Sequence, residues 1–287
     1  MKADKASAAF GAANTATVTL AVDGDAAPGA VDVTLDGKAL ASVTVDASGT
    51  ATVDLPSDLK PGSHTLAAKT SGTVGVDGSE ASSSFTVTKA STNSAVSVSK
   101  ASAVQQATMT VKVAAAGAPS GYAPTGTVTV YDGSKKVGTA SVKASDKGTV
   151  KVKLPKLSAK THTIKVTYAG NADVSSSSAE AKVTVAKASS KTSVKLSKST
   201  IKASQRATAT VKLTVSGAPK GYAPTGTVTI KDGSKKIAAV KVKASDKGTV
   251  KVKLPKLSAK THTIEVSYAG SAEVAKSSTS AKLKVTK

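Results

Sequence analysis

The block GYAPTGTVTVYDGSKK at residues 121–136 recurs as GYAPTGTVTIKDGSKK at residues 221–236. Downstream of each copy the chain reads KASDKGTVKVKLPKLSAKTHTI, at residues 143–164 and, letter for letter, at residues 243–264. A nearly identical block that returns at a fixed spacing is the sequence signature of a tandem array. We therefore predict three modules of about 95 residues each. They are module 1 (residues 1–89), module 2 (residues 90–188) and module 3 (residues 189–287).

Apolar and polar residues alternate inside the repeat. In module 2, Met109, Val111 and Val113 fall on one face of one segment, and Val128 and Val130 on one face of the next. This period of two is typical of half-buried β-strands. Further runs are expected at residues 137–143, 149–154, 162–168 and 179–185 of module 2, and at residues 15–22, 31–35, 39–45, 50–55, 64–68 and 83–88 of module 1. The pattern predicts an elongated array of three seven-stranded antiparallel sandwiches.

Turns and joints separate the expected strands. Asp132-Gly133 predicts a tight turn, and Pro155 is expected to end the strand ladder because proline has no N–H to donate. Residues 1–14 read as a polar, Ala-rich lead. The joints near residues 89–94 and 186–193 are short, which predicts modules placed end to end with limited bending.

The composition restricts how these modules can be stabilised and where the chain can reside. There is no Cys and no Trp, and aromatic residues make up 2% of the chain, so the cores must be built from Val, Leu, Ile and Ala without disulfides. No apolar run approaches the roughly 20 residues that span a bilayer, and the first residues lack the apolar region of a signal peptide. We expect a fragment of a longer exported protein.

The net charge of +22 is distributed unevenly over the modules. Module 1 has 6 Lys and 10 acidic residues, module 2 has 13 Lys and 4 acidic residues, and module 3 has 21 Lys and Arg and 4 acidic residues. Such asymmetry can mark an anionic partner at one end of a chain, and it is equally consistent with a basic surface that keeps the protein soluble.

Lysines form the clearest candidate interaction surface. Lys151 and Lys153 alternate with inward apolar residues, so they point outward together, and Lys143 and Lys147 flank them. The candidate polyanion-binding face is Lys143, Lys147, Lys151, Lys153, Lys243, Lys247, Lys251 and Lys253. It could attract wall teichoic acid, acidic glycans or nucleic acid non-specifically. One Arg and few aromatics argue against sequence-specific nucleic-acid binding. The alternative is a solvated face that discourages strand pairing between molecules.

Four tyrosines have two expected roles. Tyr168 and Tyr268 end equivalent strands, where a tyrosine commonly packs its ring inward and bonds its hydroxyl to the backbone. Tyr122 and Tyr222 lie in the Gly/Pro-rich loop, where each could contact a sugar or peptide ligand. The other interpretation of this loop pair is a ring packed over the end of a sandwich or at a module joint.

Histidine is the remaining candidate for chemistry. His64, His162 and His262 occupy equivalent positions, each alone at the start of a strand, and a metal site needs several converging ligands. We therefore interpret them as residues at the edge of each core. Asp23-Gly24-Asp25 lacks the other oxygen ligands of a calcium loop. No paired carboxylates, nucleophile with a base, or phosphate-binding glycine loop is evident, so neither catalysis nor a cofactor or metal is expected.

The repeated motifs resemble a known family. PTGTVTV at residues 124–130, Asp132-Gly133, Leu154-Pro155, THTI at residues 161–164 and Tyr168-Ala169-Gly170 are similar to the bacterial immunoglobulin-like repeat of group 3. The resemblance covers nearly all of modules 2 and 3, whereas module 1 has Thr70 in place of the tyrosine. It implies an all-β chain of immunoglobulin-like sandwiches in exported or wall-associated proteins of Gram-positive bacteria.

Two functions follow as expectations. The first is a non-catalytic stalk or spacer of a bacterial surface protein, whose partners are other domains of a longer parent chain. The second is an adhesive module that binds anionic polymer through the lysines of modules 2 and 3. In both cases we expect a monomer without a membrane span, located outside the cell or at the cell wall.

Overall fold

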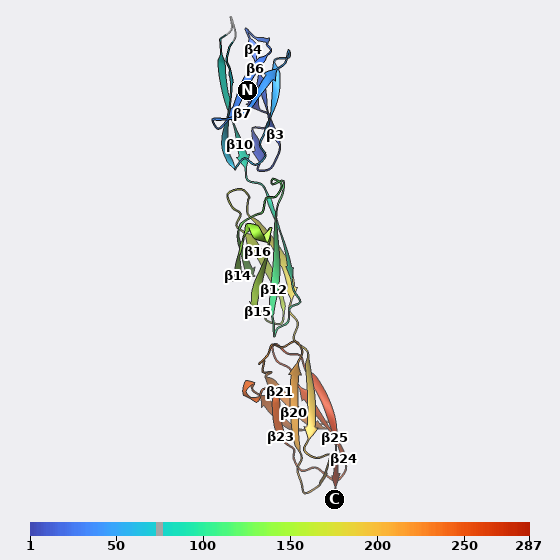
Figure 1. Cartoon of the computed structure of the whole chain (residues 1–287). Coiled ribbons are helices and arrows are strands. Elements are labelled where there is room, and N and C mark those ends of the chain that lie inside the picture. The colour runs from blue at the N-terminus through green and yellow to red at the C-terminus, as the bar shows by residue number, and fades with distance from the viewer. Residues whose placement is uncertain (73–76) are drawn as a thin grey trace.

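The computed structural model describes residues 1–72 and 77–287 and is an elongated chain of paired β-sheets (Figure 1). Two three-residue 3-10 helices, η1 (Ala144–Asp146) and η2 (Ala244–Asp246), follow equivalent strands. Among the described residues, no helix has the length and apolar character needed to cross a membrane.

The strands follow the alternation of the sequence in all three modules. Module 1 contains β1 (Lys2–Ala3), β2 (Ser7–Ala9), β3 (Asn14–Thr19), β4 (Ala21–Val22), β5 (Asp25–Ala26), β6 (Gly29–Leu35), β7 (Lys38–Val45), β8 (Thr50–Leu55), β9 (Gly62–Thr70) and β10 (Ser79–Thr88). Module 2 contains β11 (Thr92–Val98), β12 (Gln106–Ala115), β13 (Gly126–Asp132), β14 (Lys135–Val142), β15 (Thr149–Lys156), β16 (Thr161–Tyr168) and β17 (Ser177–Thr184). Module 3 contains β18 (Ser190–Leu196), β19 (Thr200–Lys202), β20 (Thr208–Val215), β21 (Gly226–Asp232), β22 (Lys235–Val242), β23 (Thr249–Lys253), β24 (Thr261–Tyr268) and β25 (Ser277–Thr286).

Each module is a sandwich of a three-stranded sheet and a larger sheet. In module 2 the sheets have the orders β11-β12-β15 and β14-β13-β16-β17. Val111 from the first sheet and Val128 from the second are fully buried in one core cluster, as their inward positions predict. Module 3 repeats this plan with β18-β20-β23 and β19-β25-β24-β21-β22. Module 1 pairs β1-β3-β8 with β2-β10-β9-β6-β7 and adds the hairpin β4-β5. The predicted all-β sandwich fold is confirmed, and the exact module boundaries stay a prediction.

The first strand of each module differs from the seven-stranded antiparallel scheme because it crosses from one sheet to the other. After pairing antiparallel with β3, the chain of module 1 continues as β2, which runs parallel to β10. Module 3 does the same with β19 and β25, and module 2 retains a single parallel bridge between Ser102 and Ala186. The expected lead at residues 1–14 is therefore wrong, since Ala3 and Phe10 are buried in the core. Their small or isolated apolar side chains leave only a weak periodic signal.

Two strand ends also differ from expectation. Pro155 does not end the ladder in module 2, because β15 continues to Lys156, which pairs with Gln106 across an irregularity in the register. Pro155 itself has no register partner, in keeping with its missing N–H.

The joints are shorter than predicted, since β11 and β18 begin inside them. Only residues 89–91 and 185–189 separate the strands of consecutive modules.

Candidate functional site

The predicted lysine face of module 2 lies along one edge of the sandwich. Lys151 and Lys153 are exposed on β15, the edge strand of the three-stranded sheet. Lys143 and Lys147 bracket η1, and Lys147 adopts a left-handed conformation with φ 46°. In the described part of the chain, lysine forms ion pairs only at Lys60 and Lys156, so the eight predicted lysines have none.

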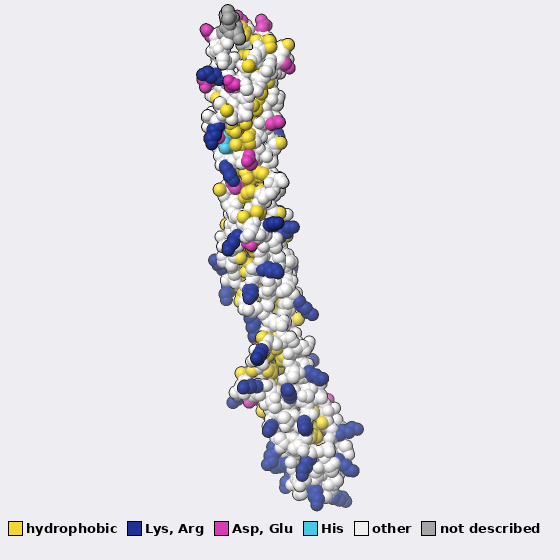
Figure 2. Space-filling model, in the orientation of Figure 1, with side chains coloured by type: hydrophobic (Ala, Val, Ile, Leu, Met, Phe, Trp, Pro, Cys, Tyr) yellow, Lys and Arg dark blue, Asp and Glu magenta, His cyan; other side chains and the backbone are white. Residues whose placement is uncertain are grey.

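Module 3 presents a denser version of this surface. Lys251 and Lys253 on β23 share the outward face of their sheet with Lys191 and Lys195 on β18 and with Lys212 on β20. Among the charged side chains visible in Figure 2, dark-blue Lys and Arg accordingly predominate in the C-terminal part of the molecule. The outward lysines of β18 and β20 were missed from sequence, although their alternation with buried residues is the same signal that identified Lys251 and Lys253. Module 2 has Asn93 and Ser97 where module 3 has the two β18 lysines.

The loop tyrosine of module 2 lies at the joint with module 1. The ring of Tyr122 meets the ring of Phe10 edge to face, with centroids 5.3 Å apart and planes 74° apart. The Tyr122 hydroxyl accepts a hydrogen bond from the Asn171 amide nitrogen at 3.0 Å. Lys60 of module 1 adds an ion pair to Asp173 at 3.0 Å and places its Nζ 5.2 Å from the centre of the Phe10 ring. The backbones of the two modules lie close together at Gly11, where an added Cβ would overlap the Gly117 carbonyl oxygen and lie 2.6 Å from the Cα of Ala118.

The joint between modules 2 and 3 uses the equivalent tyrosine and acidic positions of the following module. Its lysine comes from a different position, because Lys60 corresponds to Ser158 and not to Lys156. The Tyr222 hydroxyl donates to Glu273 Oε2 at 3.0 Å, and Lys156 Nζ lies 2.6 Å from Glu273 Oε1 and 5.6 Å from the centre of the Tyr222 ring. The amide of Gln105 donates to the Gly217 carbonyl. Val104, only 3% exposed, belongs to the core cluster of module 3 although it lies in module 2.

The charged and polar groups at the second joint keep Glu273 ionised and Tyr222 protonated. The hydrogen bond from Lys156 is the largest cause that holds the pKa of Glu273 below its usual value, against the opposing effect of burial. Burial, then the hydrogen bond to Glu273, raises the pKa of Tyr222 to about 12. Glu273 therefore stays a carboxylate and Tyr222 a donor at neutral pH. Of the two interpretations of the loop tyrosines, the geometry favours packing at a module joint.

Tyr168 and Tyr268 confirm the expected inward packing. Both rings are buried, and their hydroxyls donate to the carbonyl oxygens of Thr125 and Thr225 at 2.6 Å. Burial raises the pKa of Tyr168 to about 12. These tyrosines tie the loop that carries Tyr122 or Tyr222 to the body of each sandwich, so they position the joint from within the core.

Each histidine is anchored by an aspartate that the sequence did not reveal as its partner. His162 Nδ1 lies 2.7 Å from Asp132 Oδ2, and its Nε2 lies 3.0 Å from the Ser158 carbonyl oxygen. His64 and His262 pair in the same way with Asp36 and Asp232, each at 2.7 Å. In each module the aspartate is the first residue of the Asp-Gly turn. It lies at the end of the strand that pairs with the strand of the histidine, so only the register of the sheet could have revealed the contact. No cluster of three or more His, Cys, Asp and Glu able to hold a metal occurs in the described residues.

The His64–Asp36 pair should make the stability of module 1 depend on pH. Burial lowers the pKa of His64, but the Asp36 hydrogen bond, the Lys60 carbonyl and the Asp36 charge together raise it above 6.5. The His64 hydrogen bond, then that of the Thr65 N–H, holds the pKa of Asp36 below 3.8. The histidine contribution is complete below pH 6.5 and is lost as the pH rises through the raised pKa. The aspartate contribution is present above pH 3.8 and is lost as the pH falls through the lowered pKa.

We therefore expect the melting temperature of module 1 to fall when the pH is raised from about 6 to about 8. Calorimetry across this range measures the effect, with His64→Gln as the control that removes the titrating group. An unchanged slope in that variant would show that another group is responsible.

The paired sheets and the buried tyrosine tied to a loop carbonyl define the immunoglobulin-like class of β-sandwich. Residues 92–186 and 194–286 match the family model of the bacterial Ig-like domain (group 3). These stretches make up more than half of the chain, which therefore belongs to this family. A search among curated proteins finds no similar sequence.

Several solved structures are similar to this chain at low identity. Domains A168–A170 of titin are 9% identical, with 99% of this chain and 97% of that chain covered and a TM-score of 0.40. Three N-terminal domains of the bacteriophage RB49 Hoc capsid protein are 13% identical, with the same coverage and a TM-score of 0.31. The fibronectin(III)-like modules of CbhA from Clostridium thermocellum are 14% identical, covering 67% of this chain and 94% of that chain, with a TM-score of 0.30.

Proposed function

We propose that this chain is a spacer that holds other parts of a longer bacterial surface protein apart. The observation that carries the proposal is that each joint is packed and bonded through equivalent positions of the following module. In both joints a loop tyrosine and an acidic residue of the following module contact the preceding module. Tyr122 meets Phe10 and Asp173 pairs with Lys60, whereas Tyr222 and Glu273 both meet Lys156. Immunoglobulin-like modules of this kind are generally structural, and bacterial members are commonly extracellular. We place this spacer at the cell wall.

The joint contacts differ in strength. Burying the side chain of Val104 stabilises the second joint by about 1.5–3 kcal/mol. The Lys156–Glu273 ion pair is partly exposed, with side chains 42% and 37% accessible, and exposed pairs contribute only about 0–1 kcal/mol. The apolar contact therefore supplies most of the stabilisation, and the ion pair and the tyrosine hydroxyl set the orientation.

Replacing Val104 by Asp should release module 3 from module 2, because a carboxylate in the core cluster of module 3 would lose its hydration. Small-angle scattering should show a shorter average maximum dimension and a broader distance distribution. Ser204→Asp is the matched control, since Ser204 occupies the equivalent corner of module 3, away from both joints. Identical scattering from the wild type and Val104→Asp would contradict the proposal.

A second function, adhesion to polyanions, is favoured by the exposed and unpaired lysines on the three-stranded sheets. The positive charge of these lysines is enough to attract wall teichoic acid or an acidic glycan. Binding of this kind weakens steeply as the salt concentration rises. The single Arg of the chain and its 2% of aromatic residues favour non-specific over sequence-specific binding.

Heparin affinity chromatography tests this second function. The quadruple variant Lys151→Glu, Lys153→Glu, Lys251→Glu and Lys253→Glu should elute at clearly lower salt than the wild type. The matched control changes the exposed hairpin lysines Lys135, Lys136, Lys235 and Lys236 to Glu, with the same change in net charge. Equal losses in both variants would show that net charge, and not this face, determines retention.

A further inference from the structure

We infer that the C-terminal end of module 3 is a docking face for the N-terminal end of another immunoglobulin-like module that carries an acidic residue at the position of Glu273. The inference rests on the proposed spacer function, because it extends the joint geometry to a third surface. It specifies the partner by its chemistry: a loop tyrosine, an exposed loop carbonyl and a carboxylate.

The same three positions of the preceding module build the second joint and recur at the end of module 3. In module 2 they are Val104, Gln105 and Lys156, which meet the module 3 core, the Gly217 carbonyl and Glu273. In module 3 they are Ser204, Gln205 and Lys256. The backbone hydrogen bonds establish this correspondence. The Gln105 N–H donates to the Ser102 carbonyl oxygen, and the Gln205 N–H donates to the carbonyl oxygen of Lys202, which is the counterpart of Ser102. Lys156 and Lys256 lie in the identical stretch LPKLSAKTHTI.

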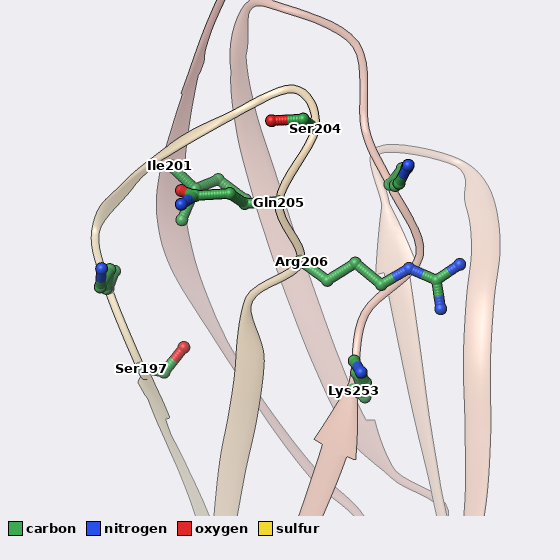
Figure 3. Close-up of a pocket in the computed structure, with 8 residues that line it drawn as sticks. Ser197, Ile201, Ser204, Gln205, Arg206 and Lys253 are labelled. Atoms are coloured by element: carbon green, nitrogen blue, oxygen red, sulfur yellow. The ribbon is translucent and has the colours of Figure 1, made fainter.

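An open pocket of about 480 Å³ occupies this end of module 3, and every charged residue that lines it is basic. Lys198, Arg206, Lys253 and Lys256 line it together with Ser204 and Gln205. In the view of Figure 3, the side chain of Arg206, the only arginine of the chain, extends across the loop that follows Lys253. A guanidinium presents a planar set of donors that matches a carboxylate. The pocket therefore complements the charge of a residue such as Glu273 or Asp173.

Exposure of identical residues supports the same interpretation. Leu157 is buried at the joint end of module 2, whereas its counterpart Leu257 is only half-buried at the end of module 3. Ala159 is half-buried, whereas Ala259 is exposed. Leu157 packs in the core of module 2, where Lys156 pairs with Gln106, and module 3 lacks this pairing. More apolar surface is therefore accessible at the end of module 3 than at the end of module 2.

The face on module 3 is more polar than the face on module 2. Ser204 replaces the buried Val104, and Arg206 replaces Gln106. Docking here therefore depends less on apolar burial and more on charge than the joint between modules 2 and 3. This difference predicts a salt-sensitive contact that selects an acidic partner.

A four-module chain tests the inference. Residues 188–287 are joined directly after Lys287, so that Ala188 of the appended copy follows Lys287 as Ala188 follows Lys187 in the native chain. Because the native chain has no Cys, cysteines placed at Ser245 of module 3 and at Ser245 of the copy can carry spin labels specifically. Pulsed electron–electron distance measurements should give one narrow distance at low salt that broadens as salt is raised.

Charge variants identify the contact. Arg206→Glu with Lys256→Glu should abolish the narrow distance, and Glu273→Lys in the appended copy should restore it. The control, Lys235→Glu with Lys236→Glu, carries the same charge change and should leave the distance narrow. A broad distance in the unmodified four-module chain, no effect of the double variant, or no restoration would each overturn the inference. Labels at Ser145 and Ser245 of the native chain test the proposed spacer function separately, because they span only the joint between modules 2 and 3.

Discussion

Replacing Tyr168 by Ala is expected to lower the free energy of unfolding of module 2 by about 3–5 kcal/mol, the range for removing a large buried aromatic side chain. The Tyr168 ring has no exposed surface, and its hydroxyl bonds to the Thr125 carbonyl. For a domain of 60–100 residues, each kcal/mol changes the melting temperature by about 4–8 °C. The melting temperature of module 2 should therefore fall by more than about 10 °C.

Calorimetry of the whole chain measures this effect as a shift in the unfolding transition of module 2. Tyr168→Phe keeps the ring and loses only the hydroxyl bond, so it should cost about 0.5–1.5 kcal/mol. Tyr268→Ala should instead shift the transition of module 3. Comparable, small shifts for Tyr168→Ala and Tyr168→Phe would show that the ring does not support the core.

Replacing Gly11 by Ala should open the joint between modules 1 and 2. Gly11 has φ +91°, and an added Cβ would overlap the backbone of Gly117 and Ala118 in module 2. Backbone atoms cannot move aside as a flexible side chain can, so the two modules must separate. Separation removes the Phe10–Tyr122 contact and the Lys60–Asp173 ion pair. The distance between spin labels at Ser48 and Ser145 should change from narrow to broad.

Gly24→Ala separates joint opening from backbone strain. Gly24 has a similar φ of +94° but nothing within 4 Å of an added Cβ. Both substitutions therefore incur the left-handed strain of about 1–2 kcal/mol, and only Gly11→Ala should broaden the distance. Equal broadening in the two variants would mean that strain in module 1, and not the close approach at the joint, controls the arrangement.

The sequence predicted the features that depend on local alternation. Val111, Val128 and Tyr168 are buried as expected, because the two faces of a strand are distinguished by every second residue. The family was also recognisable, since its motif order is repeated almost letter for letter. The first strand of module 1 was missed because Ala3 and Ala8 contribute little hydrophobic signal.

The short joints were predicted, but the contacts across them could not be, because the partner residues are far apart in sequence. Lys156 meets Glu273, and Gln105 meets Gly217, only after two complete sandwiches have folded. Periodicity within a strand carries no information about such contacts. The His162–Asp132 pair was missed for a related reason, since it depends on the pairing of β13 with β16.

The central claim is that the joints hold neighbouring modules in one orientation. The most direct measurement is the pulsed electron–electron distance between spin labels on cysteines introduced at Ser145 and Ser245, which span the joint of Val104, Tyr222 and Glu273. We expect a single narrow distance in the wild-type background and a broad distribution after Val104→Asp. A broad distribution in the wild-type background would contradict the claim.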